Sequence, residues 1–338
     1  MLRVLCRFVA GLFLLPIISC TDKRLPEHER DFAFKDTSAI TQIRITDKNG
    51  ACSNLQRTAK GWIVNNLYTC RSEAILNLME VIKRIDVKSP VSSETAPTIL
   101  KSMSTSALKV ELLCASKTVR VFYVGFETED GEGNYMLLEN TAKGSNFEKP
   151  FICFIPGFKG YLRPRYIADP QEWRDRLVIN YSPEILKSIK VQYTDAVSAD
   201  SSFDIELLST TQFTLRNAKG KSLAYNNEAM RQYLKYFMNI NYERLITSKN
   251  IKREDSLKHS KPFVEVRVTD KAQQCKTFLF YRAPFTGKVN PEMGIQYTYD
   301  PDRCYLNFED GKEWAIVQYF VFGKWMVSPL YFLHPVQN

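Results

Sequence analysis

The chain has 338 residues, of which 44% are hydrophobic and 25% are charged, and it carries a formal net charge of +9. This is an ordinary globular composition, and the chain is long enough for two hydrophobic cores. Its lysines and arginines are scattered without a dense run, which argues against nucleic-acid binding.

The first nineteen residues predict a signal peptide. Arg3 and Arg7 give a positive start, and the uncharged run 8–18 is shorter than the about 20 apolar residues that a spanning helix needs. The residues before Cys20, Ile-Ile-Ser, resemble a bacterial lipobox, in which the cysteine is acylated and cleavage falls before it. We therefore expect lipidation at Cys20. The alternative is a cleaved secretory signal followed by an incidental cysteine.

Residues 20–36 are predicted to be a tether between the lipid and the first folded part. The sequence after Cys20 is Thr-Asp-Lys-Arg, whereas an acidic cluster at this place is typical of surface-exported lipoproteins of the Bacteroidota type. The prediction is therefore a protein anchored by lipid in the inner or outer membrane and facing the periplasm. Surface exposure is not expected.

Six further cysteines follow Cys20, and their wide spacing matches neither a zinc site nor a redox dithiol. In an oxidising compartment an even number permits disulfides, but unpaired, buried thiols fit equally well. Both readings stay open for these positions: Cys52, Cys70, Cys114, Cys153, Cys275 and Cys304.

Two segments predict amphipathic helices in the same register. One starts at Ser72 and the other at Asn227, and both residues are favourable N-caps. Each member of the second apolar set follows its partner in the first by 155 positions, which suggests an internal repeat. The two sets are Ile75, Leu78, Met79, Ile82 and Ile85, and Met230, Tyr233, Leu234, Phe237 and Ile240.

Segments with period-2 alternation flank both helices, as in ITQIRIT and LKSIKVQ, and they predict half-buried strands. The expected fold class is α+β, with two tandem repeated halves. Each half would be an antiparallel β-meander sheet covered by one amphipathic helix. The expected boundaries are 37–180 and 181–338, and the motif PRY near the end of the first half would match PLY near the end of the second.

The chain resembles lipoproteins of the domain-of-unknown-function family 4340, in their Bacteroidota form. The resemblance rests on FKDTSAITQIRITDKNG, GWIVNN, RSEAILNLMEVIKRIDVKSPV, YVGFETEDGEGNYM, PGFKGYLRPRY and WRDR, and it is densest between residues 34 and 176. It implies no established activity and no catalytic residue. Because some members are encoded beside ABC-transporter subunits, it implies an envelope complex.

Motifs for catalysis or cofactor binding are absent from the sequence. None of the three histidines falls in a metalloprotease motif, and there is no Walker loop, dinucleotide fingerprint or nucleophile elbow. We predict no catalytic residue, no metal site and no cofactor. The acidic stretch ETEDGEGNY is interpreted as a solvated hairpin turn at Asp130-Gly131, because it lacks the order of acids of an EF-hand.

The stretch IPGFKGYLRPRY is the most distinctive one, because rigid Pro and Gly turns would present basic and aromatic side chains. Arg and Tyr are enriched in binding hot spots. The candidate binding surface consists of Lys159, Tyr161, Arg163, Arg165 and Tyr166. The alternative is a purely structural turn, in which the aromatic residues pack on the sheet.

The function predicted from these observations is a non-enzymatic binding or scaffolding role, with the membrane reached through lipidated Cys20 and an envelope protein as partner. The competing hypothesis is an enzyme acting on cell-wall or glycan material, with Glu129 and Asp130 in acid and base roles. That hypothesis requires two carboxylates that face a cleft. The sequence identifies neither ligand nor partner.

Overall fold

The structure is a computed structural model that describes residues 27–141, 143–246, 260–285 and 297–334. The predicted signal peptide and the predicted lipidation site at Cys20 lie outside the described residues. Among the helices of the described part, none is both long and apolar enough to cross a membrane.

The chain divides into two compact units, which we describe separately. Unit 1 covers Met1–Trp173 and unit 2 covers Arg174–Asn338. The division falls after Trp173, seven positions before the boundary expected from the sequence at residue 180.

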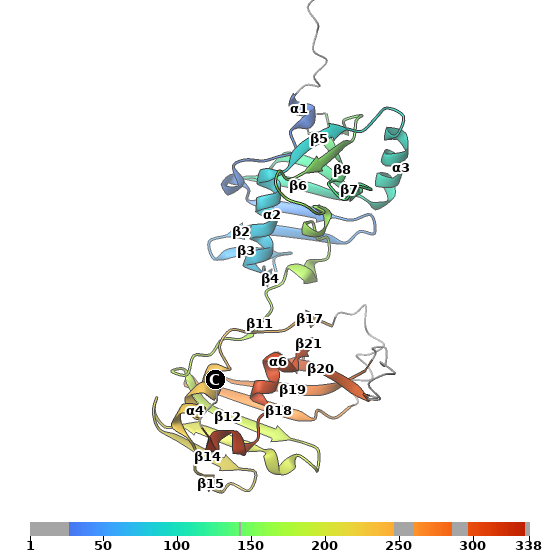
Figure 1. The fold of residues 1–338 in the computed structure, drawn as a ribbon. Helices are drawn as coiled ribbons and strands as arrows, with labels where there is room; N and C mark the ends of the chain where they lie inside the picture. The colour runs from blue at the N-terminus through green and yellow to red at the C-terminus, as the bar shows by residue number, and fades with distance from the viewer. Residues whose placement is uncertain (1–26, 142, 247–259, 286–296, 335–338) are drawn as a thin grey trace, which may run out of the picture. The chain divides into compact units, whose positions relative to one another are not determined.

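Unit 1 is built on a ten-stranded antiparallel sheet (Figure 1). The strands follow the order β4-β3-β2-β1-β6-β7-β8-β10-β5, and β9 pairs with β8. Four hairpin-linked strands therefore run outward from the centre in one direction, and the strand after the main helix closes the opposite edge. The bounds are β1 Gln42–Thr46, β2 Cys52–Thr58, β3 Gly61–Val64, β4 Tyr68–Thr69, β5 Asp86–Pro90, β6 Leu108–Cys114, β7 Lys117–Glu127, β8 Asn134–Asn140, β9 Ser145–Asn146 and β10 Phe151–Phe154.

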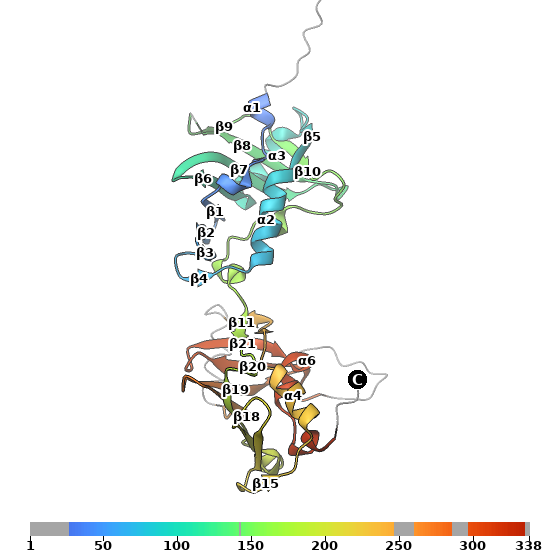
Figure 2. The same cartoon turned by 90° about the vertical axis from the view of Figure 1, so that its left-hand side faces the viewer.

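Helix α2 (Ser72–Arg84) crosses one face of this sheet, from the β4 edge towards the β5 edge (Figure 2). Its buried residues are Ile75, Leu78, Val81 and Ile82, which pack in one core cluster with strand residues such as Leu55. Short helical segments complete this unit: α1 Glu27–Arg30, η1 Thr37–Ala39, η2 Arg163–Arg165 and η3 Pro170–Trp173.

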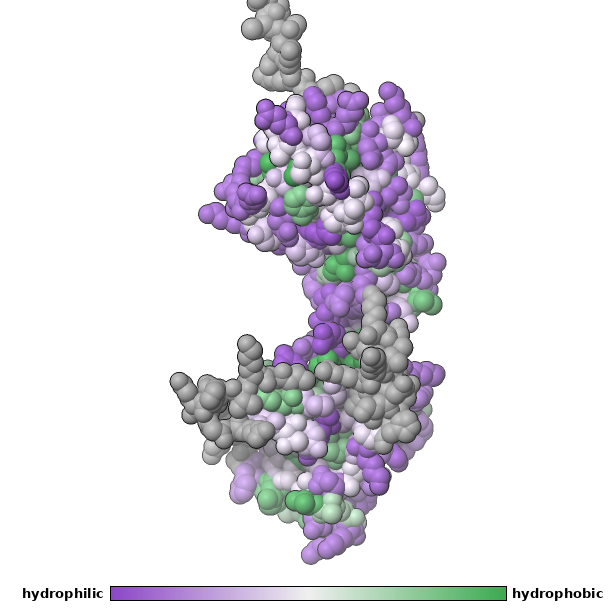
Figure 3. All heavy atoms as spheres, turned by 90° about the vertical axis from the view of Figure 1, so that its right-hand side faces the viewer, coloured by the Kyte–Doolittle hydropathy of each residue, from purple (hydrophilic) through white to green (hydrophobic). Residues whose placement is uncertain are grey.

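Helix α3 (Ala96–Ser106) covers the other face of the same sheet. Its Ile99 and Met103 pack with Leu137, whereas the neighbouring strand residues Met136 and Leu138 belong to the core under α2. Because successive side chains of a strand point to opposite faces, the two helices lie on opposite sides. Seen from the side on which α3 lies, hydrophilic residues dominate the surface of unit 1 (Figure 3).

Unit 2 contains a nine-stranded antiparallel sheet in the order β15-β14-β13-β12-β18-β19-β20-β21-β17, and a two-stranded sheet of β11 and β16. As in unit 1, hairpin-linked strands lead away from the first strand, and a strand that follows the helix closes the far edge. The bounds are β11 Leu177–Ile179, β12 Leu186–Tyr193, β13 Phe203–Leu207, β14 Phe213–Asn217, β15 Ser222–Leu223, β16 Ile240–Asn241, β17 Arg244–Leu245, β18 Val264–Asp270, β19 Cys275–Pro284, β20 Tyr299–Phe308 and β21 Glu313–Gln318.

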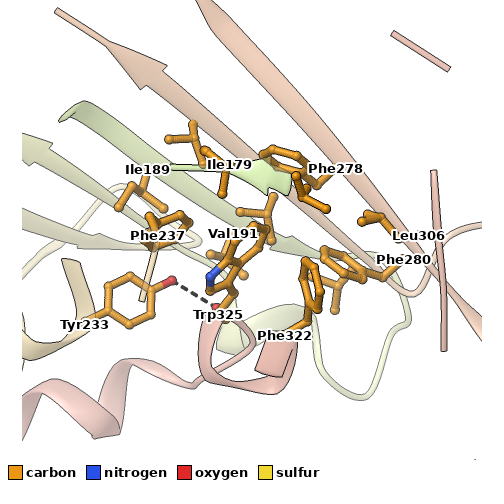
Figure 4. Packing of buried hydrophobic residues seen from close by; sticks show 14 of the residues in the cluster. Ile179, Ile189, Val191, Tyr233, Phe237, Phe278, Phe280, Leu306, Phe322 and Trp325 are labelled. Atoms are coloured by element: carbon orange, nitrogen blue, oxygen red, sulfur yellow. Dashed lines mark hydrogen bonds between the residues drawn. The ribbon is translucent and has the colours of Figure 1, made fainter. Parts of the chain in front are cut away.

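The core of unit 2 lies between its sheet and helix α4 (Asn227–Lys235) and is rich in aromatic residues (Figure 4). Trp325 stacks on Phe237 with ring centroids 4.7 Å apart, and the hydroxyl of Tyr233 donates a 2.9 Å hydrogen bond to the carbonyl of Trp325. The remaining helical segments are η4 Ala199–Ser201, α6 Tyr319–Phe322, η7 Gly323–Trp325 and η8 Pro329–Leu333.

The predicted fold class is wrong. The protein is mostly β, with 41% of residues in strands and 21% helical. Neither large sheet is a simple meander, because β1 pairs with β6 and β12 pairs with β18, and unit 1 carries α-helices on both faces. The two conspicuous amphipathic segments account for only a small part of the fold. Tight hairpins such as Ala115-Ser116, where two non-glycine residues take positive φ, do not follow from the sequence pattern.

Both predicted helices are present, but their N-caps are one residue earlier than expected. The N-cap of α4 is Asn226, whose side-chain oxygen accepts from the amides of Glu228 and Ala229. The N-cap of α2 is Arg71, whose side chain makes no capping bond. The two helices therefore start with different chemistry.

The start of each main helix is met by a late segment of its own unit, and only in unit 2 does this segment contain one of the two motifs expected to match, PLY. The amide of Arg71 donates to the carbonyl of Trp173 at 2.8 Å, and the amide of Asn226 donates to the carbonyl of Phe332 at 2.6 Å. Pro170–Trp173 thus takes in unit 1 the place that Pro329–Leu333 takes in unit 2. In each unit the last helical turn holds the first turn of the main helix.

Candidate ligand-binding site

A groove of about 430 Å³ lies in unit 1, beside the first turns of α2. It is bounded by η1, by the β2–β3 hairpin and by the residues that join β4 to the helix. Apolar side chains form most of its wall. The lining residues are Thr37, Ser38, Arg57, Gly61, Trp62, Cys70, Ser72, Ile75, Leu76 and Met79.

Arg57 and Trp62 face each other across the β2–β3 hairpin. Each lies two positions along its strand from a buried residue, Leu55 or Val64, so both side chains point to the face of the sheet that α2 covers. At Arg57 and Trp62 this face extends beyond the helix. The guanidinium carbon of Arg57 is 4.9 Å from the centroid of the Trp62 ring. This contact holds a cation flat against the apolar wall.

Two backbone carbonyls fix the Arg57 side chain. Its Nε donates to the carbonyl of Ile40 and its Nη2 to the carbonyl of Thr37, both at 2.9 Å. The third nitrogen, Nη1, has no partner among the described residues. Arg57 is also the only charged residue in the lining, so the lining itself carries one fixed positive charge.

Helix α2 contributes a stripe of four residues to the groove. Ser72, Ile75, Leu76 and Met79 recur every three or four positions, so they share one side of the helix. Leu76 is 68% exposed, so a large apolar side chain lies at the rim of the groove. The first turn of α2, whose amides have no side-chain cap, lies at the end of the groove that Ser72 lines.

The thiol of Cys70 lies in the base of the groove. Its amide donates to the carbonyl of Trp62 at 2.8 Å, and the residue is 4% exposed. Burial raises the pKa of this thiol to about 12. Cys70 is therefore neutral at physiological pH, and it serves as a small apolar wall element and not as a nucleophile.

Unit 2 is built differently at the corresponding place. By strand register, Leu207 and Phe213 take the positions of Arg57 and Trp62, because both pairs lie two residues beyond a buried cross-strand pair. Tyr225 stands in place of Cys70. Its ring lies 6.0 Å from that of Phe213, and its hydroxyl donates to the carbonyl of Phe213 at 3.0 Å. An aromatic ring occupies the place where unit 1 has only a thiol.

The predicted binding surface does not form one exposed patch. Tyr166 is 2% exposed and belongs to the core, where its ring meets Phe122 edge to face. Arg163 donates through Nη2 to the carbonyl of Ser106 at 2.7 Å and through Nη1 to the carbonyl of Val124 at 3.3 Å. The structure therefore places these two residues in structural roles, as the alternative reading of this stretch expected.

The other three residues of that surface lie on the outside of the loop. Lys159 and Tyr161 are exposed, and the guanidinium carbon of Arg165 lies 4.6 Å from the centroid of the Phe158 ring. Arg165 also donates to the backbone carbonyl of Tyr161. The outer part of the loop thus carries Lys159 and Arg165 on its surface, and neither residue lines the groove beside α2.

The acidic stretch forms the hairpin turn between β7 and β8. Asp130 and Glu132 form ion pairs with Lys88, and the hydroxyl of Thr128 donates to Asp130. These hydrogen bonds, above all that from Thr128, lower the pKa of the Asp130 carboxyl to about 2. Within the described residues, no group of three or more His, Cys, Asp or Glu side chains is arranged to hold a metal ion.

Asn134, at the end of the acidic stretch, connects this hairpin to the Pro-Gly loop. Its side-chain oxygen accepts from the amide of Leu162 at 2.7 Å, and its side-chain nitrogen donates to the carbonyl of Gly125 at 3.4 Å. The residue is fully buried. Its contacts therefore hold the hairpin and the Pro-Gly loop together.

A second hollow, of about 340 Å³, lies at the ends of β12, β13 and β14 in unit 2. It is more polar than the groove in unit 1, and its one acidic lining residue, Asp204, pairs with Arg216 at 3.3 Å. Neither hollow brings together two carboxylates.

The six described cysteines are all unpaired. Cys70, Cys153 and Cys304 are buried, Cys52 and Cys114 are half-buried, and Cys275 is exposed. Of the two readings of these cysteines, the structure shows the one without disulfides.

Comparisons with known proteins found no match for this chain. No protein-family model matches it, and neither the curated proteins nor the solved structures include a match. The resemblance to family 4340 therefore remains an expectation from the sequence, and the function is argued from the site alone.

Proposed function

We propose that this protein is a membrane-anchored lipoprotein of the cell envelope that binds a ligand in the groove beside α2. One observation carries the binding role: the groove joins an apolar wall to a single fixed cation, Arg57. A few convergent polar groups in an otherwise apolar hollow are typical of ligand sites, and about 430 Å³ lies in their usual range.

The geometry favours binding over acid–base catalysis. A general acid needs a pKa raised towards the working pH, and the pKa of Asp130 is moved the other way, to about 2. Asp130 lies on an exposed turn and is paired with Lys88. The buried thiol of Cys70 is likewise held in its unreactive form.

The anchor half of the proposal rests on the lipobox-like residues before Cys20. In the proposed arrangement the acyl chains hold the protein on the periplasmic face of a membrane. The predicted tether 20–36 is shorter than expected, because Phe32 is already buried in the core of unit 1. An envelope protein is the proposed partner, in line with the family resemblance. Multiple acyl chains give stable attachment where a single chain would not.

The anchor is tested by replacing Cys20 with alanine in the full chain. The expected result is loss of labelling by a fatty-acid probe, together with release from the membrane fraction or accumulation of an unprocessed precursor. Cys275→Ala, which removes an exposed cysteine far along the sequence from the lipobox-like residues, serves as the matched control. Unchanged labelling and fractionation of Cys20→Ala would refute the anchor.

The groove is tested by filling it. Cys70→Tyr introduces the residue found at the corresponding position of unit 2, so the new ring should occupy the hollow. We expect loss of ligand binding with the protein still folded. Cys275→Tyr, at an exposed cysteine in unit 2, controls for the substitution itself.

A further inference from the structure

We infer that the ligand of the groove is an aliphatic chain that ends in a carboxylate. This inference rests on the proposed function, because it names the chemistry of the ligand at the same site. Three features of the described residues carry it: the shape and polarity of the wall, the charge at one end, and an exposed leucine at the rim.

The wall suits an alkyl chain. Ile75, Leu76 and Met79 form a continuous stripe along α2, and Trp62 and Cys70 face the hollow from the sheet side. Met and Leu adapt to an apolar guest without demanding a particular hydrogen-bond pattern. The polar side-chain groups of the lining include Arg57 and the hydroxyls of Thr37, Ser38 and Ser72.

The polar end suits an anion. Arg57 is held in place by two carbonyls, and its Nη1 has no partner among the described residues. Guanidinium N–H groups form strong, charge-assisted hydrogen bonds with carboxylates. The uncapped start of α2, which opens onto the groove at Ser72, adds a partial positive charge of the same sign.

Two carboxylates flank this end: Asp36, which precedes Thr37, and Glu73, in the first turn of α2. Asp36 accepts from the amide and the hydroxyl of Ser38, so it caps the turn of η1, and these bonds lower its pKa. Glu73 lies 4.0 Å from Arg71. Neither carboxylate forms an ion pair with Arg57 among the described residues, and their negative charges disfavour a ligand with more than one negative charge.

The exposed leucine at the rim of the groove favours an alkyl chain over a polar ligand. Leu76 is 68% exposed, and unit 2 has Arg231 at the corresponding position of α4. A leucine kept on the surface gains free energy when an apolar chain covers it. The arginine in unit 2 has no such requirement.

The experiment uses the full chain in lipid nanodiscs and measures quenching of tryptophan fluorescence by 8-bromooctanoate, since bromine quenches an indole at short range. Two matched probes, 8-bromo-1-octanol and 8-bromooctylammonium, keep the chain and change the charge. A tripeptide of leucine with a free carboxylate is added as a competitor. Trp62→Phe identifies the reporting indole.

We expect saturable quenching by the carboxylate, with affinity at least roughly tenfold above that for the alcohol, no binding of the ammonium, and loss of quenching in Cys70→Tyr. Arg57→Gln should abolish the preference for the acid over the alcohol. Arg44→Gln removes a cation on β1 that is paired with Glu111 on β6, and it should leave the preference for the acid unchanged. Thermal unfolding of each variant identifies any that fails to fold.

The possible failures are distinguishable. Equal affinity for acid and alcohol would refute the carboxylate assignment and leave the groove as a binding site. Strong displacement by the leucine tripeptide, with weak binding of 8-bromooctanoate itself, would refute an aliphatic ligand in favour of a peptide carboxyl terminus. Quenching that persists in Cys70→Tyr, or absence of quenching by every probe, would refute the groove as the site and with it the proposed binding function.

Discussion

The two units differ in the residues that lead into the main helix. In unit 1 these are Cys70 and Arg71, and in unit 2 they are Tyr225 and Asn226. Tyr225 packs on Phe213, and Asn226 caps α4. Cys70 leaves a hollow instead, and Arg71 leaves the start of α2 without a cap.

Two units with the same strand order can therefore differ in local stability, because one of them forms a binding site where the other forms stabilising contacts. In unit 2, apolar contacts and a cap satisfy the start of the helix. In unit 1, the same place gives up an aromatic contact and a capping bond, each typically worth about 1 kcal/mol. Features of this kind, which lower stability without a structural return, are expected where a protein binds a ligand.

The largest expected effect concerns the reactivity of Cys70. A rise of its pKa from 9.0 to about 12 lowers the fraction of thiolate at pH 8 by roughly a thousandfold. Alkylation at pH 8 should therefore be far slower at Cys70 than at the exposed Cys275, and it should accelerate as the pH approaches 12. Peptide mass spectrometry after timed labelling measures both sites. Equal rates at pH 8 would mean that the thiol is not buried.

The second prediction separates the core side of α2 from its groove side. Leu78→Ala should lower the free energy of unfolding by about 2–5 kcal/mol, because Leu78 is fully buried against the sheet. Leu76→Ala, a matched change two residues earlier, should cost less than about 0.5 kcal/mol and should weaken binding of 8-bromooctanoate. Chemical denaturation measures both. A larger loss of stability in Leu76→Ala than in Leu78→Ala would mean that Leu76, and not Leu78, faces the core.

The third prediction concerns how unit 1 holds its final loop, where unit 2 uses the hydrogen bond from Tyr233 to Trp325. Arg163→Ala leaves the carbonyls of Ser106 and Val124 without this donor, so unfolding should become easier by about 1–3 kcal/mol. Lys159→Ala, on the exposed side of the loop, is the control. If Arg163→Ala left the melting temperature unchanged and abolished co-purification of the partner protein, the loop would be a binding surface after all.

The smallest effect is expected at the cap of α4. Asn226→Ala should cost about 1 kcal/mol, because its side chain accepts from two first-turn amides. Asn227→Ala, at the position that the sequence suggested as the cap, should change stability by a few tenths of that amount. Thermal unfolding of the two variants decides between the positions. A larger loss in Asn227→Ala would contradict the assigned cap.

The sequence predicted the helices at Ser72 and Asn227, because a buried stripe on a helix repeats every three or four residues. It predicted strands such as β1 and β12 from their alternation. It did not predict the mostly β fold, because sheet size depends on which distant strands pair, and residues such as Asn65 and Asn66 take turn conformations that leave no mark in periodicity. The register of the helices does not reveal that β1 pairs with β6.

The groove was missed for the same reason. Arg57, Trp62 and Cys70 come together only through the pairing of β2 with β3 and through the path into α2. A signal was nevertheless available. At the offset of 155 positions that relates the two helices, Cys70 aligns with Tyr225 and Leu76 with Arg231. A smaller residue just before the helix, together with an apolar residue in place of a charged one in its second turn, could have identified the site.

The most direct test of a ligand groove in unit 1 is a crystal structure of the protein with bound 8-bromooctanoate, in which the anomalous signal locates bromine. We predict a bromine peak in contact with Ile75, Leu76 or Met79, and carboxylate density within hydrogen-bonding distance of Arg57. Cys70→Tyr crystals should lack that peak. Bromine located elsewhere on the protein, with the groove empty at a concentration that saturates quenching, would contradict the account.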